Sequence, residues 1–231
     1  MSTFLQLCQK LKEKTIDSGT GPSTTTGQVG QLAKLVSQIS EGWARLQQDR
    51  EDWKWMRKSF YVDTVASDGA YAYTDCTDTV SLVAIARFSR WYQDCFKAYL
   101  SSEGVGVEYP LIWMDWETFR RIYRYGTQTD GQPAHVSVDP TQAFVLGPKP
   151  SAVYRVSGDY QIGPQIMTAD ADIPEMPTRF HDLVVYEAMM EYGFNSVAPE
   201  ALQFAQIEGS RLKNALELDQ LPSMVYADPL A

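Results

Sequence analysis

Apolar residues recur at helical spacing near the N-terminus of the chain. The pattern in residues 4–14 predicts an amphipathic helix, and Thr3 and Gln6 have the spacing of a capping box at its start. Residues 29–46 alternate apolar spacings of three and four, which fits a coiled-coil seam or a core helix packed on the first as a hairpin. We favour the core helix because the seam is short. Its repeating positions are Val29, Leu32, Val36, Ile39, Trp43 and Leu46.

Glycines and hydroxyl side chains fill the connection between these helices, SGTGPSTTTGQVG at residues 18–30. A phosphate-binding loop would need a buried strand before it, a lysine after it and free backbone N–H groups. Here a helix precedes the run, no lysine directly follows Gly27, and Pro22 has no N–H. The segment is therefore predicted to be a connecting loop, with Thr25 or Thr26 as the N-cap of the second helix.

Apolar and polar positions alternate in the next part of the chain, which is typical of strands. Residues 60–64 and 71–73 alternate on either side of Asp68-Gly69 and predict a β-hairpin. Residues 87–100 could pair as further strands.

One more helix and three β-rich runs complete the middle. Residues 110–126 predict a helix that ends at Gly126, and residues 134–138, 143–147 and 152–163 are short runs rich in β-formers. Turn residues separate these runs, so we expect a small antiparallel sheet.

Helical patterns return towards the C-terminus. Residues 177–193 predict a helix with Thr178 as its cap and Gly193 just after its end. A second helix should begin at Pro199 and stop at Pro222.

Two small residues of this last helix, Ala205 and Gly209, would let a neighbouring helix approach closely. The final residues, 222–231, contain two prolines and no periodicity. We expect them to be extended and free until a partner orders them.

The order of the elements predicts an α+β fold, in which N- and C-terminal helices form a helical bundle with a small antiparallel β region inserted in the middle. We expect a single domain. Its parts are the bundle at 1–50 and 177–221, the mostly β insertion at 51–176 with one helix near 110–125, and a flexible C-terminal tail at 222–231.

The composition indicates that the chain can fold without a disulfide or a structural metal ion. Its 231 residues are 44% hydrophobic, enough for a packed core without disulfides or metals.

The three cysteines are odd in number and far apart, which favours a reducing compartment; they are Cys8, Cys76 and Cys95. No signal peptide and no stretch of membrane-spanning length is present, so we expect a soluble protein without a membrane partner.

The net charge of −9 is concentrated at one end of the chain. Residues 168–231 hold eleven acidic and three basic side chains, a net charge of −8. Tight, sequence-independent DNA binding rests on lysine and arginine, so we expect none here.

Histidine chemistry has few candidates in this sequence. Neither His135 nor His181 has a second histidine or a cysteine at the spacing of a zinc site. Asp182 follows His181, but adjacent residues of a helix point to different faces and cannot pair. We expect His181 to be a boundary residue near the start of a helix.

Carboxylates are similarly unpromising as a catalytic or metal site. Asp170, Asp172 and Glu175 lack the glycine and the bidentate glutamate of a calcium loop. Asp115 and Glu117 lie two apart on different sides of a predicted helix and form no glycosidase dyad. We therefore expect no cofactor, no metal and no catalytic residue.

Tryptophan, tyrosine and arginine are interleaved in three segments. Such residues could pack a core, stack nucleic-acid bases, or build a protein–protein interface in which all three types are enriched. The acidic balance argues against base stacking. The residues that we predict to make subunit–subunit contacts are Trp53, Trp55, Arg57, Trp91, Tyr92, Trp116 and Arg120.

Five long segments, in this order along the chain, resemble a family of tailed-bacteriophage adaptor proteins, the head-to-tail connectors that dock beneath the portal. The resemblance extends from about residue 3 to about residue 222 and involves no catalytic motif. The segments are TFLQLCQKLKEKTIDSGTGPSTTTGQVGQLAKLV, DWKWMRKSF, RFSRWYQDCFKAYL, DWETFRRIYRYG and IPEMPTRFHDLVVYEAMMEYG.

The resemblance implies a structural protein of the virion neck, made in the cytoplasm of the host bacterium. Identical subunits would form a ring, usually dodecameric, that binds the portal protein, extends the DNA channel and receives tail or neck proteins. Genomic DNA would pass through without tight binding. The family's C-terminal segment reaches the portal, which here implies a docking role for Leu221, Pro222, Met224, Val225 and Tyr226.

Two other classes of function remain open at this stage. A nucleic-acid-binding accessory protein of genome packaging is the alternative, and retention on DNA at low salt would identify it. A hydrolase of the cell envelope would need His181 or the carboxylates between Asp170 and Glu175 in a cleft.

Overall fold

The computed structural model describes residues 1–15, 20–195 and 198–222. The chain folds into two compact units. One, the helical unit, consists of Met1–Met56 and Pro164–Ala231; the other, the β unit, is the insertion Arg57–Gly163. The insertion is therefore shorter at both ends than the expected 51–176.

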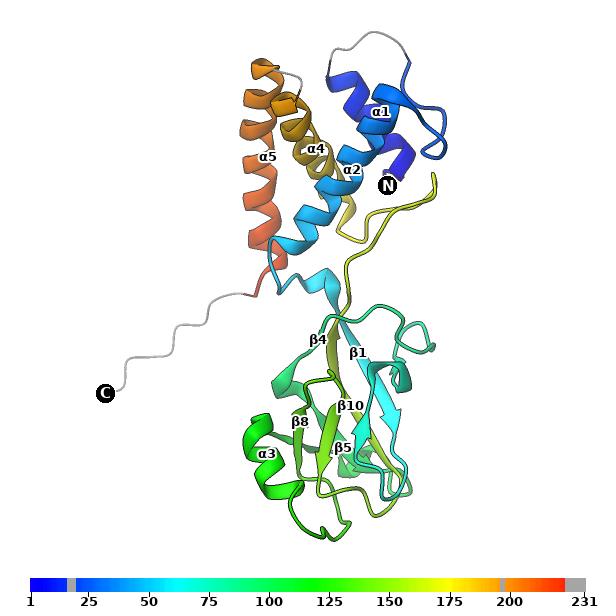
Figure 1. The fold of residues 1–231 in the computed structure, drawn as a ribbon, viewed down its shortest axis with the longest axis vertical. Helices are drawn as coiled ribbons and strands as arrows, with labels where there is room; N and C mark the ends of the chain where they lie inside the picture. Colours follow the sequence, from blue (N-terminus) through cyan, green and yellow to red (C-terminus); the bar gives the residue numbers. More distant parts are fainter. Residues whose placement is uncertain (16–19, 196–197, 223–231) are drawn as a thin grey trace, which may run out of the picture. The chain divides into compact units, whose positions relative to one another are not determined.

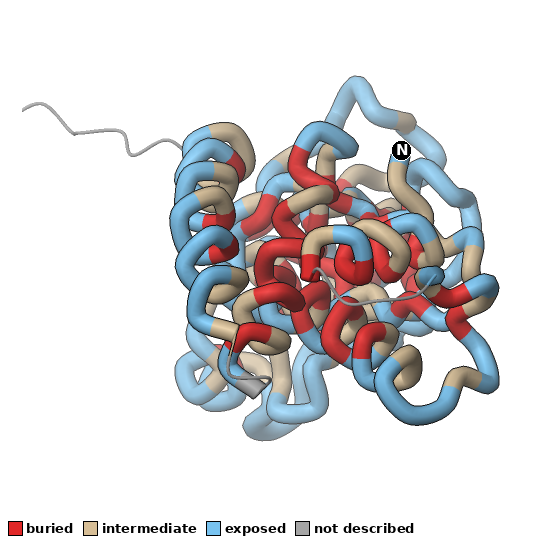
Figure 2. Tube along the Cα trace, turned by 90° about the horizontal axis from the view of Figure 1, so that it is seen from above, coloured by how far each residue is buried: buried red, intermediate tan, exposed pale blue. Residues whose placement is uncertain are grey.

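The helical unit is arranged around one central helix (Figure 1). Helix α4 is buried along most of its length, and α1, α2 and α5 all pack against it. Exposed positions lie on the outer sides of the surrounding helices (Figure 2). The bounds are α1 Phe4–Lys14, α2 Gly30–Gln48, the 3₁₀ turn η5 Thr178–Phe180, α4 His181–Asn195 and α5 Pro199–Gln220.

Local capping explains where the first helix begins, but not where the second does. Thr3 and Gln6 form the predicted capping box at the start of α1. The N-cap of α2 is Val29, without a side-chain hydrogen bond, so the prediction of Thr25 or Thr26 is wrong. Thr25 is instead held by the distant Asp170, which outcompetes a local cap.

Glycines set the close approach of the helices to α4. A Cβ on Gly42 of α2 would lie 3.1 Å from the backbone nitrogen of Ala188. Gly193 lies inside α4 and not after its end as predicted. A Cβ there would lie 2.9 Å from that of Leu202, so the glycine allows the start of α5 to approach closely. Gly209 faces Tyr186 as its small size suggested.

The β unit contains two sheets where one small sheet was predicted. The larger has the order β3-β1-β10-β5-β6 with β4 also paired to β10; the smaller has the order β2-β9-β8-β7. The larger sheet is built from β1 Arg57–Asp63, β3 Thr77–Asp78, β4 Arg90–Trp91, β5 Lys97–Leu100, β6 Tyr109–Pro110 and β10 Tyr154–Gln161. The smaller is built from β2 Ala70–Tyr71, β7 Ile112–Trp113, β8 His135–Val138 and β9 Phe144–Gly147.

Helical segments of the β unit are short. The longest is α3, Trp116–Tyr123, and the residues before it form strands, so the helix begins later than predicted. The helix ends at Tyr123 with Arg124 as its C-cap, and Gly126 just beyond has a φ of +67°. The remaining 3₁₀ turns are η2 Tyr73–Asp75, η3 Gln93–Cys95 and η4 Val105–Val107; η1, Lys54–Met56, precedes β1.

The predicted hairpin around Asp68-Gly69 is wrong. All seven residues of β1 pair with β10, about a hundred residues later in the chain, whereas β2 joins the other sheet by pairing with β9. The alternation in residues 60–64 correctly predicts a strand there, which the structure extends back to Arg57, but alternation carries no information on which strand is its partner.

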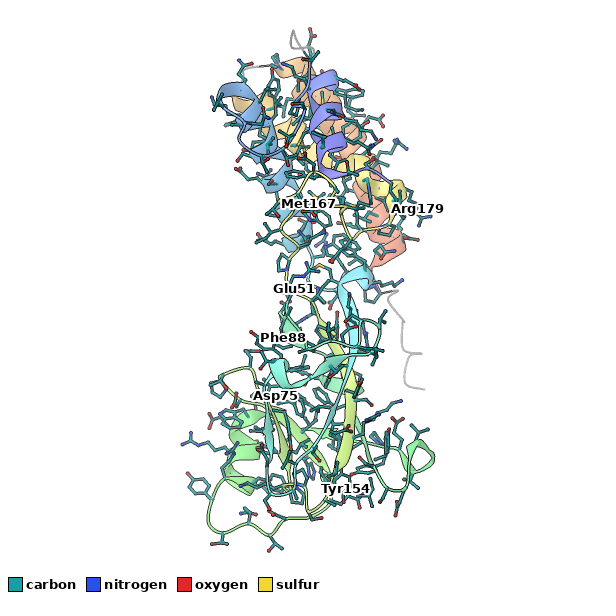
Figure 3. The ribbon with its side chains drawn as sticks, turned by 90° about the vertical axis from the view of Figure 1, so that its right-hand side faces the viewer. Glu51, Asp75, Phe88, Tyr154, Met167 and Arg179 are labelled. Atoms are coloured by element: carbon teal, nitrogen blue, oxygen red, sulfur yellow. The ribbon has the colours of Figure 1, made fainter. Side chains whose placement is uncertain are left out.

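An aromatic cluster forms the core of the β unit. The ring of Phe60 on β1 lies 4.6 Å from Trp91, 5.7 Å from Phe96 and 5.9 Å from Phe144, measured between ring centroids. Phe144 belongs to the smaller sheet, so the cluster joins the two sheets. Phe88, labelled in Figure 3, extends it beside Trp91 at 4.5 Å.

These observations overturn the predicted fold class. The middle is not a small antiparallel region, because two sheets fill a unit of its own and β7 pairs with β8 in parallel. The terminal helices do not form a regular bundle either. The most extensive helix–helix packing is between the two C-terminal helices, while α1 and α2 touch each other less than they touch α4.

Candidate functional site

Trp53 and Trp55 stack on each other, with ring centroids 4.4 Å apart. Trp53 is fully buried, and its Nε1–H donates to the carbonyl oxygen of Leu46 at 3.0 Å. Trp55 is half-buried. Of this pair, Trp55 is therefore the residue whose side chain reaches solvent.

Arg57 and Tyr92 lie together on the surface of the β unit. The Arg57 guanidinium lies 4.3 Å from the centre of the Tyr92 ring and is paired with Asp159 at 2.6 Å. The Tyr92 hydroxyl donates to Oε1 of Gln161 at 2.6 Å. Both side chains are thus held in place, and a fixed arginine–aromatic pair loses little entropy when a partner covers it.

Trp91 is next to Tyr92 in the sequence, but it is a core residue and not a surface residue. Only 5% of its surface is exposed, and its Nε1–H donates to the carbonyl oxygen of Gln142 at 2.9 Å. The core of the β unit therefore accounts for Trp91, as it does for the neighbouring Phe96.

Helix α3 carries the other two predicted contact residues. Trp116 is half-buried and stacks on Phe119, whereas Arg120 is exposed. Asp115 caps the helix by accepting from two backbone N–H groups, which assigns this carboxylate a structural role. Arg120 and the next residue, Arg121, are both exposed in the last turn of α3, where the helix dipole favours cations.

Both histidines are anchors within their own units. His181 is buried; its Nδ1 accepts from the backbone N–H of Ser2, and its Nε2–H donates to the carbonyl oxygen of Met176. Burial lowers the pKa of His181, so the ring is neutral. His135 of β8 bonds the hydroxyl of Tyr123 through Nδ1 at 2.8 Å.

Two carboxylates that follow Thr168 accept hydrogen bonds that hold loops in place. Asp170 accepts from the backbone N–H and hydroxyl of Thr25, and these bonds lower the pKa of Asp170. Asp172 accepts from the N–H groups of Thr168 and Ala169, which lower its pKa in the same way. In the part of the chain that the structure describes, no three His, Cys, Asp or Glu side chains group as metal ligands.

Much of the negative charge of the C-terminal helices is paired within the helical unit. Glu191 pairs with Arg45, and Glu217 pairs with Arg50. Arg179, labelled in Figure 3, pairs with Asp219. The C-terminal helices therefore present less unpaired negative charge than the count of acidic residues suggested.

Glu187 of α4 differs from these surface carboxylates because it is buried, with only 6% of its surface exposed. Burial raises the pKa of Glu187 above its ordinary value of 4.5, despite the attraction of Lys213 and Arg45. The folded chain thus favours the protonated side chain, whereas the unfolded chain ionises it as pH rises past 4.5. Ionisation costs stability in that window, and the cost is complete above the folded pKa.

We therefore expect Glu187→Gln to raise the melting temperature at pH 8 and to have little effect below pH 4.5, where both states are protonated. Thermal melts at the two pH values would measure this. The exposed Glu13→Gln serves as the control and should show no such pH dependence. A Glu187→Gln variant less stable than the native protein at pH 8 would contradict the assignment.

The structure exposes an apolar feature that the sequence analysis missed. Residues 79–84 form the tip of a short hairpin, and all of them are exposed. Val80, Leu82 and Val83 are 83%, 68% and 59% exposed. The signal was an aliphatic run next to Asp78, but such a run is equally typical of a buried strand.

The tail residues Met224, Val225 and Tyr226 lie outside the described residues. Leu221 and Pro222, at the end of α5, are half-buried and exposed respectively. Their predicted docking role therefore stays a prediction.

Residues 2–228 match the model of a family described as SU10 adaptor protein. The search of curated proteins found no match. Among the residues described, no helix is long and apolar enough to cross a membrane.

Proposed function

The chain belongs to the SU10 adaptor protein family, and from this membership we propose that it is a head-to-tail connector of a bacteriophage virion. Identical subunits form a ring, which we propose to be dodecameric. The ring binds the portal protein, extends the channel for the genome and offers an attachment site to tail or neck proteins. The observation that carries the proposal is the match of nearly the whole chain to this family.

Exposed arginines beside half-buried aromatic side chains support a role in assembly. Arg57 with Tyr92, and Trp116 with Arg120, are two separate surfaces of the residue types enriched in interfaces. A ring needs such separate surfaces, because each subunit meets its two neighbours with different faces. We propose these four residues and Trp55 as contact residues.

A structural role without catalysis fits the surroundings of the titratable groups. Both nitrogens of the buried His181 bond to backbone atoms, so neither is free to take a proton from a substrate. The carboxylates of Asp170 and Asp172 accept hydrogen bonds from backbone N–H groups. These bonds weigh against the hydrolase alternative at His181, Asp170 and Asp172.

The test is assembly on the purified portal protein. We expect mass photometry to show a complex whose added mass is a whole-number multiple of the subunit mass, with the full ring forming only when subunits are in excess. The same measurement on a chain ending at Leu221 should show a folded subunit with weaker attachment. A mixture that stays unassembled under both conditions would contradict the connector role.

Retention on DNA separates this function from the alternative in genome packaging. The −9 charge predicts elution at low salt, because there is little phosphate neutralisation to drive binding. Tight, salt-sensitive retention would favour the nucleic-acid-binding protein instead.

A further inference from the structure

The hairpin tip 79–84 displays three aliphatic side chains to solvent in four residues. Val80, Leu82 and Val83 are each more than half exposed, although the same unit has a large core that could have covered them. Single exposed aliphatic residues are ordinary, but a contiguous group on one turn marks an interaction site.

The tip is rigid because Asp78 organises its backbone. Oδ1 of Asp78 accepts from the N–H groups of Val80 and Ser81 at 2.9 and 2.7 Å and from the Ser81 hydroxyl at 3.0 Å. Oδ2 accepts from the buried Tyr160 hydroxyl at 2.9 Å. One carboxylate thus ties the exposed turn to the core of the sheet.

Leu82 sits in a conformation that leucine disfavours. Its φ is +57°, a left-handed conformation that glycine and asparagine adopt much more readily. The N–H of Leu82 donates to the carbonyl oxygen of Asp78 at 3.0 Å, which fixes the turn. A bulky apolar residue at a strained and solvent-exposed position points to a use for its side chain.

The helical unit carries a pocket whose lining, like the hairpin tip, is largely apolar. A pocket of about 430 Å³ opens between the end of α1, α4 and the start of α5. A cavity of about 150 Å³ accepts benzene, so this pocket has room for a leucine with a valine. Its lining is largely apolar and includes Met189, Ala198, Pro199, Ala201 and Phe204, with Lys14 and Glu200 as the charged members.

A second copy of the chain is the occupant that these two features fit. In the part of the chain that the structure describes, the β unit carries this apolar projection and the helical unit carries this apolar pocket. An interface between a projection and a pocket is heterologous, because the two faces differ, and heterologous contacts build a ring when the rotation between neighbouring subunits closes. Phe204, 47% exposed, and Ile207, 62% exposed, would widen the apolar contact beside the pocket.

We propose that the hairpin tip 79–84 of one subunit inserts into the pocket beside α5 of the neighbouring subunit. This inference rests on the proposed function, because it assigns one further contact between neighbouring subunits of the ring. Leu82 is the central residue of the projection, and Ala201 lies in the wall of the pocket.

The first test is Leu82→Asn, with ring formation measured on the portal protein. Asparagine accepts the left-handed conformation, so the free subunit should melt at the same temperature or about 2–4 °C higher. Loss of the buried leucine should weaken ring assembly about 10- to 100-fold. A residue needed only for folding would change both quantities in the same direction.

The control is Leu218→Asn, which removes another leucine that is 88% exposed and lies outside tip and pocket. It should leave ring assembly unchanged. Equal losses from both variants, or normal assembly by Leu82→Asn, would overturn the inference. So would a Leu82→Asn ring that forms normally but no longer binds a tail protein, since the tip would then contact that partner.

The second test is a disulfide between subunits. In a Cys95→Ser background, which leaves only the buried Cys8 and Cys76, the pair Leu82→Cys and Ala201→Cys should give a ladder of cross-linked chains under oxidation. Each single variant should stay monomeric on the gel. A ring of the expected mass without a ladder would refute this contact alone, whereas failure of the native protein to assemble would refute the proposed function.

Discussion

Replacing Phe60 by alanine is expected to destabilise the protein by about 3–5 kcal/mol, the usual cost of deleting a buried phenylalanine. Phe60 is fully buried on β1 and contacts aromatic rings from both sheets. A Cβ on Gly158 would lie 3.1 Å from its ring, so the sheet closes tightly over it. The cavity left by alanine cannot collapse easily, because rigid rings surround it.

Urea denaturation followed by near-ultraviolet circular dichroism would measure this cost, because that signal reports on the packed rings. Tyr125→Ala is the matched control in the same unit, since Tyr125 is 65% exposed and should cost less than about 0.5 kcal/mol. A loss of under 1 kcal/mol for Phe60→Ala would mean that the aromatic cluster does not hold the two sheets together.

Gly147→Ala is expected to displace α3 from the smaller sheet and to cost about 1–3 kcal/mol or more. Gly147 lies on β9, opposite His135 of β8. A Cβ there would lie 2.5 Å from Cδ2 of Tyr123 and 2.8 Å from Cε2 of Phe119. The helix must then move, and the hydrogen bond between Tyr123 and His135 would break with it.

Hydrogen exchange of the α3 amides, together with denaturation, would report both effects. Gly106→Ala is the control, because a Cβ at Gly106 meets nothing within 4 Å. If the clash is the cause, Gly147→Ala should cost clearly less when Tyr123 is already alanine. Additive costs in the double variant would place the cause in the backbone instead.

The sequence by itself determined the elements whose signals are local. The capping box of Thr3 and Gln6, the start of α5 at Pro199 and the strands β8, β9 and β10 follow from neighbouring residues alone. Family membership could also be inferred, because it is encoded in long segments of ordered residues.

Only the tertiary structure decided what those elements pair with. Alternation in β1 predicts a strand, but hydrogen bonding to β10 and not to β2 depends on burying Phe60 between two sheets. Gly193 is a residue type that commonly ends helices, yet here it lies inside α4, where its lack of a Cβ makes room for Leu202.

The candidate contact residues divide along the same line. Composition identified the tryptophans and arginines, but burial separates Trp53 and Trp91, which fill cores, from Arg57 and Arg120, which face solvent. The exposed tip at Leu82 had no distinguishing local signal. An aliphatic run is buried or exposed according to what the rest of the chain places over it, and that information is not local.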